Sequence, residues 1–124
     1  MRTARRGYGE VVETVALRAL GEKLLAEARS TSSGRCSVTI HGGRVNSLRQ
    51  TAIGVAAGHR LEEHENTGEI TLQLLSGRAR VVAAEDEAVL AAGDYAVIPL
   101  RWDSFEALDD SVVLLTAAVQ GQKE

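Results

Sequence analysis

The chain has 124 residues, of which 44% are hydrophobic and 25% charged, as is typical of a globular domain with one core. Its formal net charge of −3 argues against a nucleic-acid-binding surface, because phosphate recognition needs a basic footprint. It contains no membrane-length apolar run, and its single cysteine, Cys36, cannot form an internal disulfide. We expect no export signal, because Glu10, Glu13 and Arg18 interrupt the apolar residues near the start. We therefore expect one cytoplasmic domain over residues 1–124 that does not bind membranes or nucleic acid.

The N-terminal part predicts one helix. Residues 1–9 are polar and are expected to be a flexible start, whereas the pattern from about residue 15 to 29 is helical. Gly21 lies inside this helix and costs roughly 1 kcal/mol relative to alanine, so the helix must depend on packing. One apolar stripe would cover the outside of a sheet or a partner subunit; it consists of Leu17, Leu20, Leu24 and Ala28.

The remainder, about residues 35–119, predicts short strands separated by turn residues. After a strand over 36–41, Gly42-Gly43 predicts a two-residue hairpin and a return strand over about 45–56. Gly54 in that strand predicts a bulge or a close backbone approach. Further strands are expected over about 78–84, 88–90 and 95–99, with a turn at 85–87. The last strand, 112–119, is apolar on both faces, so its outer side must also be covered.

Four turn residues have the spacing of a known family. Gly58, Gly77, Gly93 and Pro99 match the framework positions of the two motifs of the small single-domain cupins, the RmlC-like proteins. The chain resembles these proteins over about residues 45–119. The resemblance implies an all-β fold, a cupin-type double-stranded β-helix (jelly-roll barrel), here with an N-terminal α-helix. It also implies a homodimer.

The resemblance places the family's metal ligands on residues that coordinate poorly. Without gaps, the four ligand positions fall on His64, Asn66, Ile70 and Ser104. A divalent ion needs three or more converging donors, and Ile70 offers none, so the usual metal is expected to be absent. A gapped alignment would instead use Glu62, His64, Glu69 and Asp103 to hold Fe, Mn, Ni or Zn. Strand alternation argues against this set, because Glu69 would lie on the opposite face from Ile70.

A pocket is expected inside the barrel. Alternation places Ile70, Leu72 and Leu74 on one interior face. Gln50 and Gln73 lie in otherwise apolar strands, where each amide would either contact a ligand or satisfy the backbone. Trp102 would stand near the barrel mouth, as a ligand-stacking wall or as a lid over the core. The candidate pocket residues are His64, Asn66, Ile70, Leu72, Gln50, Gln73, Trp102 and Ser104.

Three functions remain open at this point. A single surviving histidine favours a metal-independent small-molecule-binding or regulatory module without a cofactor over an enzyme. The alternative is a metal-dependent cupin enzyme, of the dioxygenase or isomerase type, that uses the carboxylate-rich set. A further alternative is a dimeric interaction protein without a ligand. No catalytic residue can be assigned from the sequence.

Overall fold

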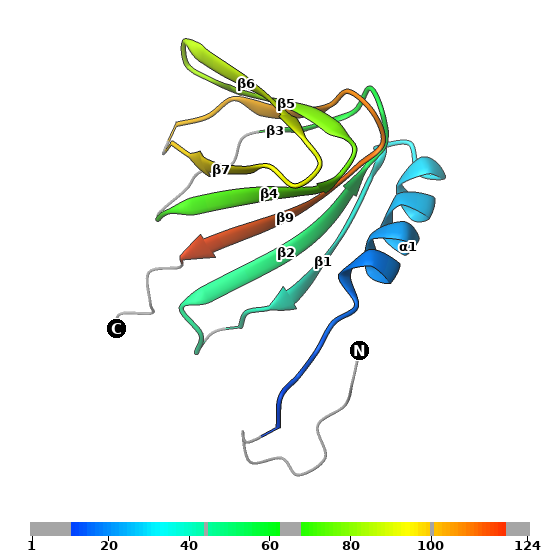
Figure 1. Cartoon of the computed structure of the whole chain (residues 1–124), viewed down its shortest axis with the longest axis vertical. Helices are drawn as coiled ribbons and strands as arrows, with labels where there is room; N and C mark the ends of the chain where they lie inside the picture. The colour runs from blue at the N-terminus through cyan, green and yellow to red at the C-terminus, as the bar shows by residue number, and fades with distance from the viewer. Residues whose placement is uncertain (1–10, 44, 63–67, 100, 119–124) are drawn as a thin grey trace.

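A computed structural model of the chain describes residues 11–43, 45–62, 68–99 and 101–118. These residues form one helix and nine strands (Figure 1). In chain order the elements are α1 (Leu17–Arg29), β1 (Arg35–His41), β2 (Leu48–Val55), β3 (Arg60–Glu62), β4 (Ile70–Ser76), β5 (Arg78–Ala83), β6 (Asp86–Ala91), β7 (Tyr95–Ile98), β8 (Ser104–Ala107) and β9 (Ser111–Ala118).

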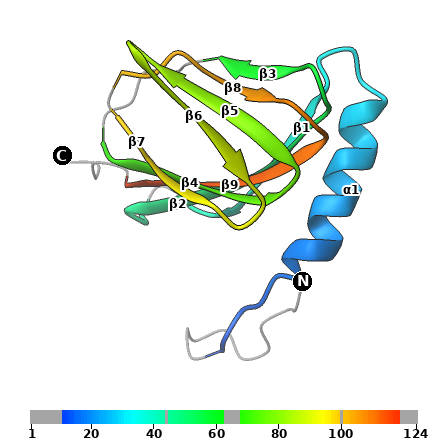
Figure 2. The same ribbon diagram turned by 45° about the horizontal axis from the view of Figure 1, so that its top comes forward.

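The strands form two antiparallel sheets that face each other (Figure 2). One sheet has five strands in the order β1-β2-β9-β4-β7, and the other has four in the order β3-β8-β5-β6. Neighbouring strands in each sheet are mostly distant in sequence, as the crossing connections of a jelly roll require. The predicted all-β jelly-roll barrel with an N-terminal helix is therefore confirmed.

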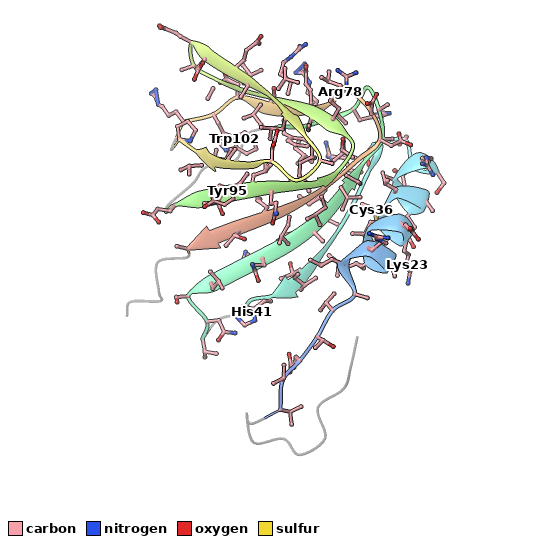
Figure 3. All side chains as sticks on the ribbon, in the orientation of Figure 1. Lys23, Cys36, His41, Arg78, Tyr95 and Trp102 are labelled. Carbon is pink, nitrogen blue, oxygen red and sulfur yellow. The ribbon has the colours of Figure 1, made fainter. Side chains whose placement is uncertain are left out.

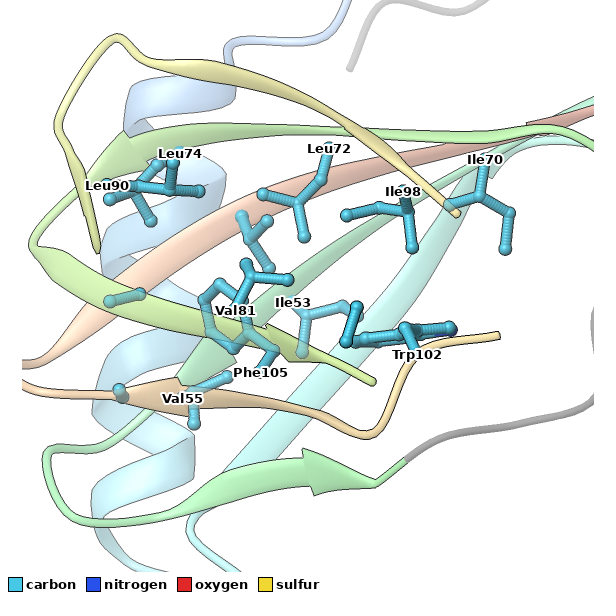
Figure 4. Packing of buried hydrophobic residues seen from close by; sticks show 14 residues of the cluster. Ile53, Val55, Ile70, Leu72, Leu74, Val81, Leu90, Ile98, Trp102 and Phe105 are labelled. Carbon is cyan, nitrogen blue, oxygen red and sulfur yellow. The ribbon is translucent and has the colours of Figure 1, made fainter. Parts of the chain in front are cut away.

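The hydrophobic core fills the space between the two sheets (Figure 4). Leu72 and Leu74 of β4, Val113 of β9 and Phe105 of β8 are completely buried, and Ile70 is 9% exposed. Burying each such side chain contributes about 1.5–3 kcal/mol, so this layer provides the main drive for folding. The burial confirms that Ile70, Leu72 and Leu74 share the interior face, as alternation predicts.

Helix α1 packs on the outside of the five-stranded sheet, mainly against β1 and β2 (Figure 1). The helix begins at Leu17, two residues later than expected, and Ala16 at its N-cap has no side chain that could hydrogen-bond the free backbone amides. Of the predicted stripe only Leu24 and Ala28 are buried. Within the described part of the chain, no helix combines the length and the apolarity needed to cross a membrane.

Two turn predictions were wrong. Gly42-Gly43 does not make a two-residue hairpin, because β1 ends at His41 and β2 begins at Leu48. The second wrong prediction is the turn at 85–87, since β6 already begins at Asp86. The β5–β6 turn instead uses Ala84 with φ = +52°, a conformation that alanine seldom adopts and that the sequence therefore does not signal.

Candidate functional site

Trp102 lies at the end of the barrel where β7 stops and β8 begins (Figure 3). Its side chain is only 4% exposed and belongs to the core cluster. Figure 4 shows the indole beside Ile53, with Ile70 and Ile98 at the same end of the core. The sequence predicted that Trp102 stands near the barrel mouth, as a ligand-stacking wall or as a lid over the core. The structure places the indole inside this end of the barrel, among side chains from three strands.

The indole Nε1 of Trp102 is buried and has no hydrogen-bond partner among the described residues. An indole N–H can only donate, so nothing but an acceptor can satisfy it. Leaving such a donor buried without a partner costs about 1–3 kcal/mol, which is why buried polar groups are nearly always paired. Any molecule that brings an acceptor to Trp102 would recover this free energy.

A small cleft of about 130 Å³ opens between β7 and the β5–β6 hairpin. Alkyl groups of Val81, Ala83 and Ile98 form much of its lining, and the exposed Asp86 and Glu87 stand at its edge. Ile98 belongs both to this cleft and to the core cluster around Trp102. An apolar cavity of roughly 150 Å³ accepts one benzene ring, so this cleft suits a compact molecule.

The structure places Gln50 and Gln73 outside the barrel, in contrast to their expected place in the pocket. Both side chains project from the outer face of the five-stranded sheet, opposite to the buried Leu72 and Leu74. Nε2 of Gln50 donates to Oγ1 of Thr116 over 3.2 Å, and Gln73 is exposed. Neither amide can therefore contact a molecule held between the sheets.

Ser104 also differs from its expected orientation. In β8 the completely buried Phe105 points into the core, so by alternation Ser104 shares the opposite face with Glu106, although the Ser104 side chain is itself buried at 6% exposure. The Glu106 carboxylate accepts hydrogen bonds from Arg60 at 3.0 Å and from Arg80 at 3.2 Å, as expected on an outer face. The family position for a metal-binding histidine is therefore one residue out of phase with the interior of this strand.

The described residues do not fit the metal site that the family resemblance implies. Ile70 fills the core without offering a donor, and Ser104, though buried, lies on the face of β8 opposite to the core residue Phe105. In the gapped set, Glu69 and Asp103 are exposed. No three His, Cys, Asp or Glu side chains within the described ranges are grouped to hold an ion. His64, Asn66 and the side chain of Glu62 lie outside the described part.

One acid partner was missed in the sequence. Sγ of Cys36 in β1 donates to Oε1 of Glu27 in α1 over 3.1 Å, and Figure 3 shows Cys36 beside the helix. This hydrogen bond is the main cause that raises the pKa of the Cys36 thiol, since it stabilises the protonated form. A raised pKa lowers the fraction of the reactive thiolate at neutral pH.

Comparison with known proteins relates the chain to solved structures alone. No protein-family model matches it, and no curated protein sequence does. A protein of unknown function from Streptococcus pyogenes matches 73% of this chain and 78% of its own, with a TM-score of 0.64 and 20% identity. A cupin superfamily protein from Desulfitobacterium hafniense matches 69% of this chain and 78% of its own, with a TM-score of 0.63 and 15% identity.

An enzyme with a longer chain shares the same fold. Salicylate 1,2-dioxygenase from Pseudoaminobacter salicylatoxidans, solved as a variant in complex with gentisate, has a TM-score of 0.68 and 19% identity. The match covers 81% of this chain but only 32% of the dioxygenase. Identities this low establish a shared fold and not a shared activity. Together with the two facing sheets and the glycine and proline framework, these matches show that the chain has a cupin-type fold.

Proposed function

We propose that this chain is a metal-independent module that binds a compact, largely apolar molecule at the Trp102 end of the barrel. The observation that carries the proposal is the buried Nε1 donor of Trp102, which has no acceptor among the described residues. Binding sites typically combine apolar walls with a few polar groups that orient the ligand. Ile98 is shared by the cleft and the core cluster that holds Trp102, although Trp102 itself does not line the cleft. A molecule in the cleft would therefore reach the orienting indole N–H by displacing core side chains next to Ile98.

The chemistry of the site limits the ligand. The cleft volume of about 130 Å³ suits one ring or a branched chain of similar size. The ligand needs at least one acceptor, such as a carbonyl oxygen, to satisfy the indole N–H. Asp86 and Glu87 at the cleft edge would repel an anion, so a neutral molecule should bind better than a carboxylate.

The residues at the family's metal-ligand positions favour ligand binding without a metal over metal-dependent catalysis. The described ligand positions of the family carry Ile70, which has no donor, and Ser104, which alternation directs away from the core that Ile70 occupies, so these two cannot converge on one ion. The lining of the cleft is mostly alkyl and can hold a molecule, and its ionisable groups are the carboxylates of Asp86 and Glu87 at the edge. These features support a binding or regulatory role.

The proposal can be tested through the chain's only tryptophan. Trp102 is both the proposed ligand contact and the sole source of indole fluorescence. Protein dialysed against a chelator would be titrated with benzamide, a neutral single ring with a carbonyl acceptor. Salicylate and gentisate serve as anionic probes, because a dioxygenase of the same fold is named for salicylate and was solved in complex with gentisate. We expect a saturable change in emission with benzamide and weaker binding of the two anions.

The Trp102→Phe variant removes the indole N–H but keeps an aromatic ring, so it tests the hydrogen bond alone. Because this variant no longer has a tryptophan, its affinity for benzamide is measured by calorimetry. Loss of one hydrogen bond should weaken benzamide binding about tenfold. The control is Val89→Thr, an exposed position on β6 that does not line the cleft, and it should leave the affinity unchanged. Equal affinity of Trp102→Phe and the original chain would refute the assigned role of Nε1.

A further inference from the structure

The five-stranded sheet ends at β7, which pairs with β4 on one side and has a free edge on the other. The backbone N–H of Leu74 in β4 donates to the carbonyl oxygen of Asp94 over 2.9 Å, which fixes the phase of this ladder. Bonded and non-bonded residues alternate in an antiparallel pair, so the backbone groups of Ala96 bond to β4 and those of Tyr95 and Val97 point away from it. Among the described residues, the N–H and C=O groups of Tyr95 and Val97 therefore have no hydrogen-bond partner.

The four-stranded sheet ends at β6 on the same side of the barrel. Figure 2 shows β6 and β7 running apart from the turn that joins them. The cleft of about 130 Å³ lies between these two strands, lined by residues 86–88 of β6 and residues 96–99 at the end of β7. We refer to these two stretches as the open seam, because here the last strand of one sheet does not pair with the last strand of the other.

The open seam has an apolar floor. Val81 and Ala83 of β5 and Ile98 of β7 line the cleft and are at most 9% exposed. Side chains alternate along a strand, so every second side chain of a segment lying beside β7 would point into the cleft. A cavity of roughly 150 Å³ holds a benzene ring, so this cleft accepts one side chain of about the size of valine or leucine.

The border of the open seam is acidic. Asp86 and Glu87 are exposed, and neither takes part in a salt bridge within the described ranges. Oδ1 of Asp86 accepts a hydrogen bond from the backbone N–H of Glu87 over 2.9 Å, which leaves its charge uncompensated. The two carboxylates attract a basic segment, whereas they repel an acidic one and a second copy of this chain, whose formal net charge is −3.

We propose that an extended, basic segment of another protein adds a strand to the free edge of β7. In this mode of recognition, backbone hydrogen bonds supply affinity, and pockets for alternate side chains supply selectivity. Here Tyr95 and Val97 provide the backbone groups, the cleft holds one aliphatic side chain, and Asp86 and Glu87 select Lys or Arg. The proposal does not rest on the proposed function, because it needs no contact with Trp102, which does not line the cleft.

Amide NMR spectroscopy of the isotope-labelled chain with the peptide acetyl-KVKVK-amide tests the proposal. We expect saturable shifts of the Tyr95 and Val97 amides and slower hydrogen exchange of both, since their N–H groups become paired. The control peptide acetyl-EVEVE-amide should bind at least about tenfold more weakly. Shifts confined to the other edge of the sheet, Arg35–His41 of β1, or equal affinity for both peptides, would overturn the proposal. So would exchange protection of Tyr95 and Val97 that rises with protein concentration in the absence of peptide, because a second copy would then be the occupant.

Backbone methylation of the peptide tests whether it binds as a strand. The N–H groups of alternate residues in an extended segment face the same edge. One variant peptide carries N-methyl groups on both valines and the other carries them on all lysines, so each keeps its side chains and loses the donors of one edge. Only one of the two should lose affinity, by about tenfold or more, because a single edge pairs with β7. Two methylated peptides that bind equally well would contradict the pairing.

Variants of the chain test the acidic border. Glu87→Lys should weaken binding of acetyl-KVKVK-amide about tenfold, since it reverses a charge beside the cleft. The matched control is Glu22→Lys, which makes the same change at an exposed position on α1 and should alter the affinity less than about twofold. Trp102→Phe should leave peptide binding unchanged, so this proposal can hold where the ligand proposal fails. Circular dichroism checks that the variants remain folded, and equal weakening by Glu87→Lys and Glu22→Lys would refute the role of the open seam.

Discussion

Gly54 of β2 lies directly against the backbone of Leu24 in α1. A Cβ built on Gly54 would stand 2.8 Å from the carbonyl carbon of Leu24 and 2.9 Å from the backbone nitrogen of Leu25. Atoms in native proteins do not approach a Cβ this closely, so the helix can dock here only because residue 54 has no side chain. The close backbone approach predicted for Gly54 is thereby confirmed.

We predict that Gly54→Ala destabilises the protein by about 1–3 kcal/mol, because the helix must move outward to admit the methyl group. Urea unfolding, followed by circular dichroism, measures the change. The control is Gly42→Ala, where the nearest atom to the new Cβ is the Thr39 methyl carbon at 3.3 Å. That side chain can shift, so the control should change stability by less than about 0.5 kcal/mol.

Asp110 should make stability depend on pH in the acid range. Its Oδ1 accepts a hydrogen bond from the backbone N–H of Ala57, and its Oδ2 accepts one from Arg29. The bond from Ala57, followed by that from Arg29, lowers the pKa of the Asp110 carboxyl in the folded state. The stabilisation is therefore present above the ordinary pKa of about 3.9 and is lost as the pH falls through the lowered value.

Asp110→Asn should accordingly cost about 1 kcal/mol near neutral pH, after allowance for solvent screening of this partly exposed pair. The difference from the original chain should shrink as the pH falls below about 4. Urea unfolding at several pH values tests this. Asp109→Asn, whose partner Arg78 is 3.2 Å away in a more exposed pair, should have a smaller effect. If the stability difference between Asp110→Asn and the original chain instead grew toward acid pH, the pKa of Asp110 would not be lowered in the folded state.

The reactivity of Cys36 should depend on Glu27. Because the hydrogen bond to Glu27 raises the pKa of the thiol, Glu27→Gln should lower that pKa and speed alkylation by iodoacetamide at a fixed pH. The positive charge of Lys23 lowers the same pKa, so Lys23→Ala should shift the pH–rate profile the other way. Profiles that move in the same direction for both variants would contradict this assignment.

The unpaired indole N–H has a consequence for stability in the absence of ligand. Trp102→Ala should cost about 3–5 kcal/mol, because it empties a packed site in the core. Trp102→Phe should cost distinctly less, since it keeps a ring and removes a buried donor that has no partner among the described residues. Urea unfolding of both variants measures this. Equal costs would mean that Nε1 is already hydrogen-bonded in the free protein.

Local patterns in the sequence were sufficient to predict short strands and their interior faces, and the resemblance to cupins implied how these strands form a barrel. The alternation of Ile70, Leu72 and Leu74 identified the interior of β4, because strand geometry fixes which side chains share a face. Gly58, Gly77 and Gly93 predicted the turns, and all three have φ between +86° and +95°, where other residues are strained. Such features depend on a few neighbouring residues and need no knowledge of the tertiary structure.

The site could not be predicted in the same way. Residues 101–103 are not part of a strand, so alternation cannot be counted from Pro99 to Ser104, and the interior position falls on Phe105 instead. Gln50 and Gln73 stand among apolar residues that face outward, where burial cannot be inferred from pattern alone. The contact between Cys36 and Glu27 joins two elements whose packing is set by Gly54, which is distant from both in sequence although it is the cross-strand partner of Cys36.

The central claim is that the Trp102 end of the barrel binds a small neutral molecule without a metal. Fluorescence titration of chelator-treated protein with benzamide, alongside elemental analysis of the same sample, tests it most directly. We predict saturable binding in protein that contains no stoichiometric Fe, Mn, Ni or Zn. Binding that disappears on chelation and returns with one of these ions, or no response of Trp102 to any of the three probes, would contradict the claim.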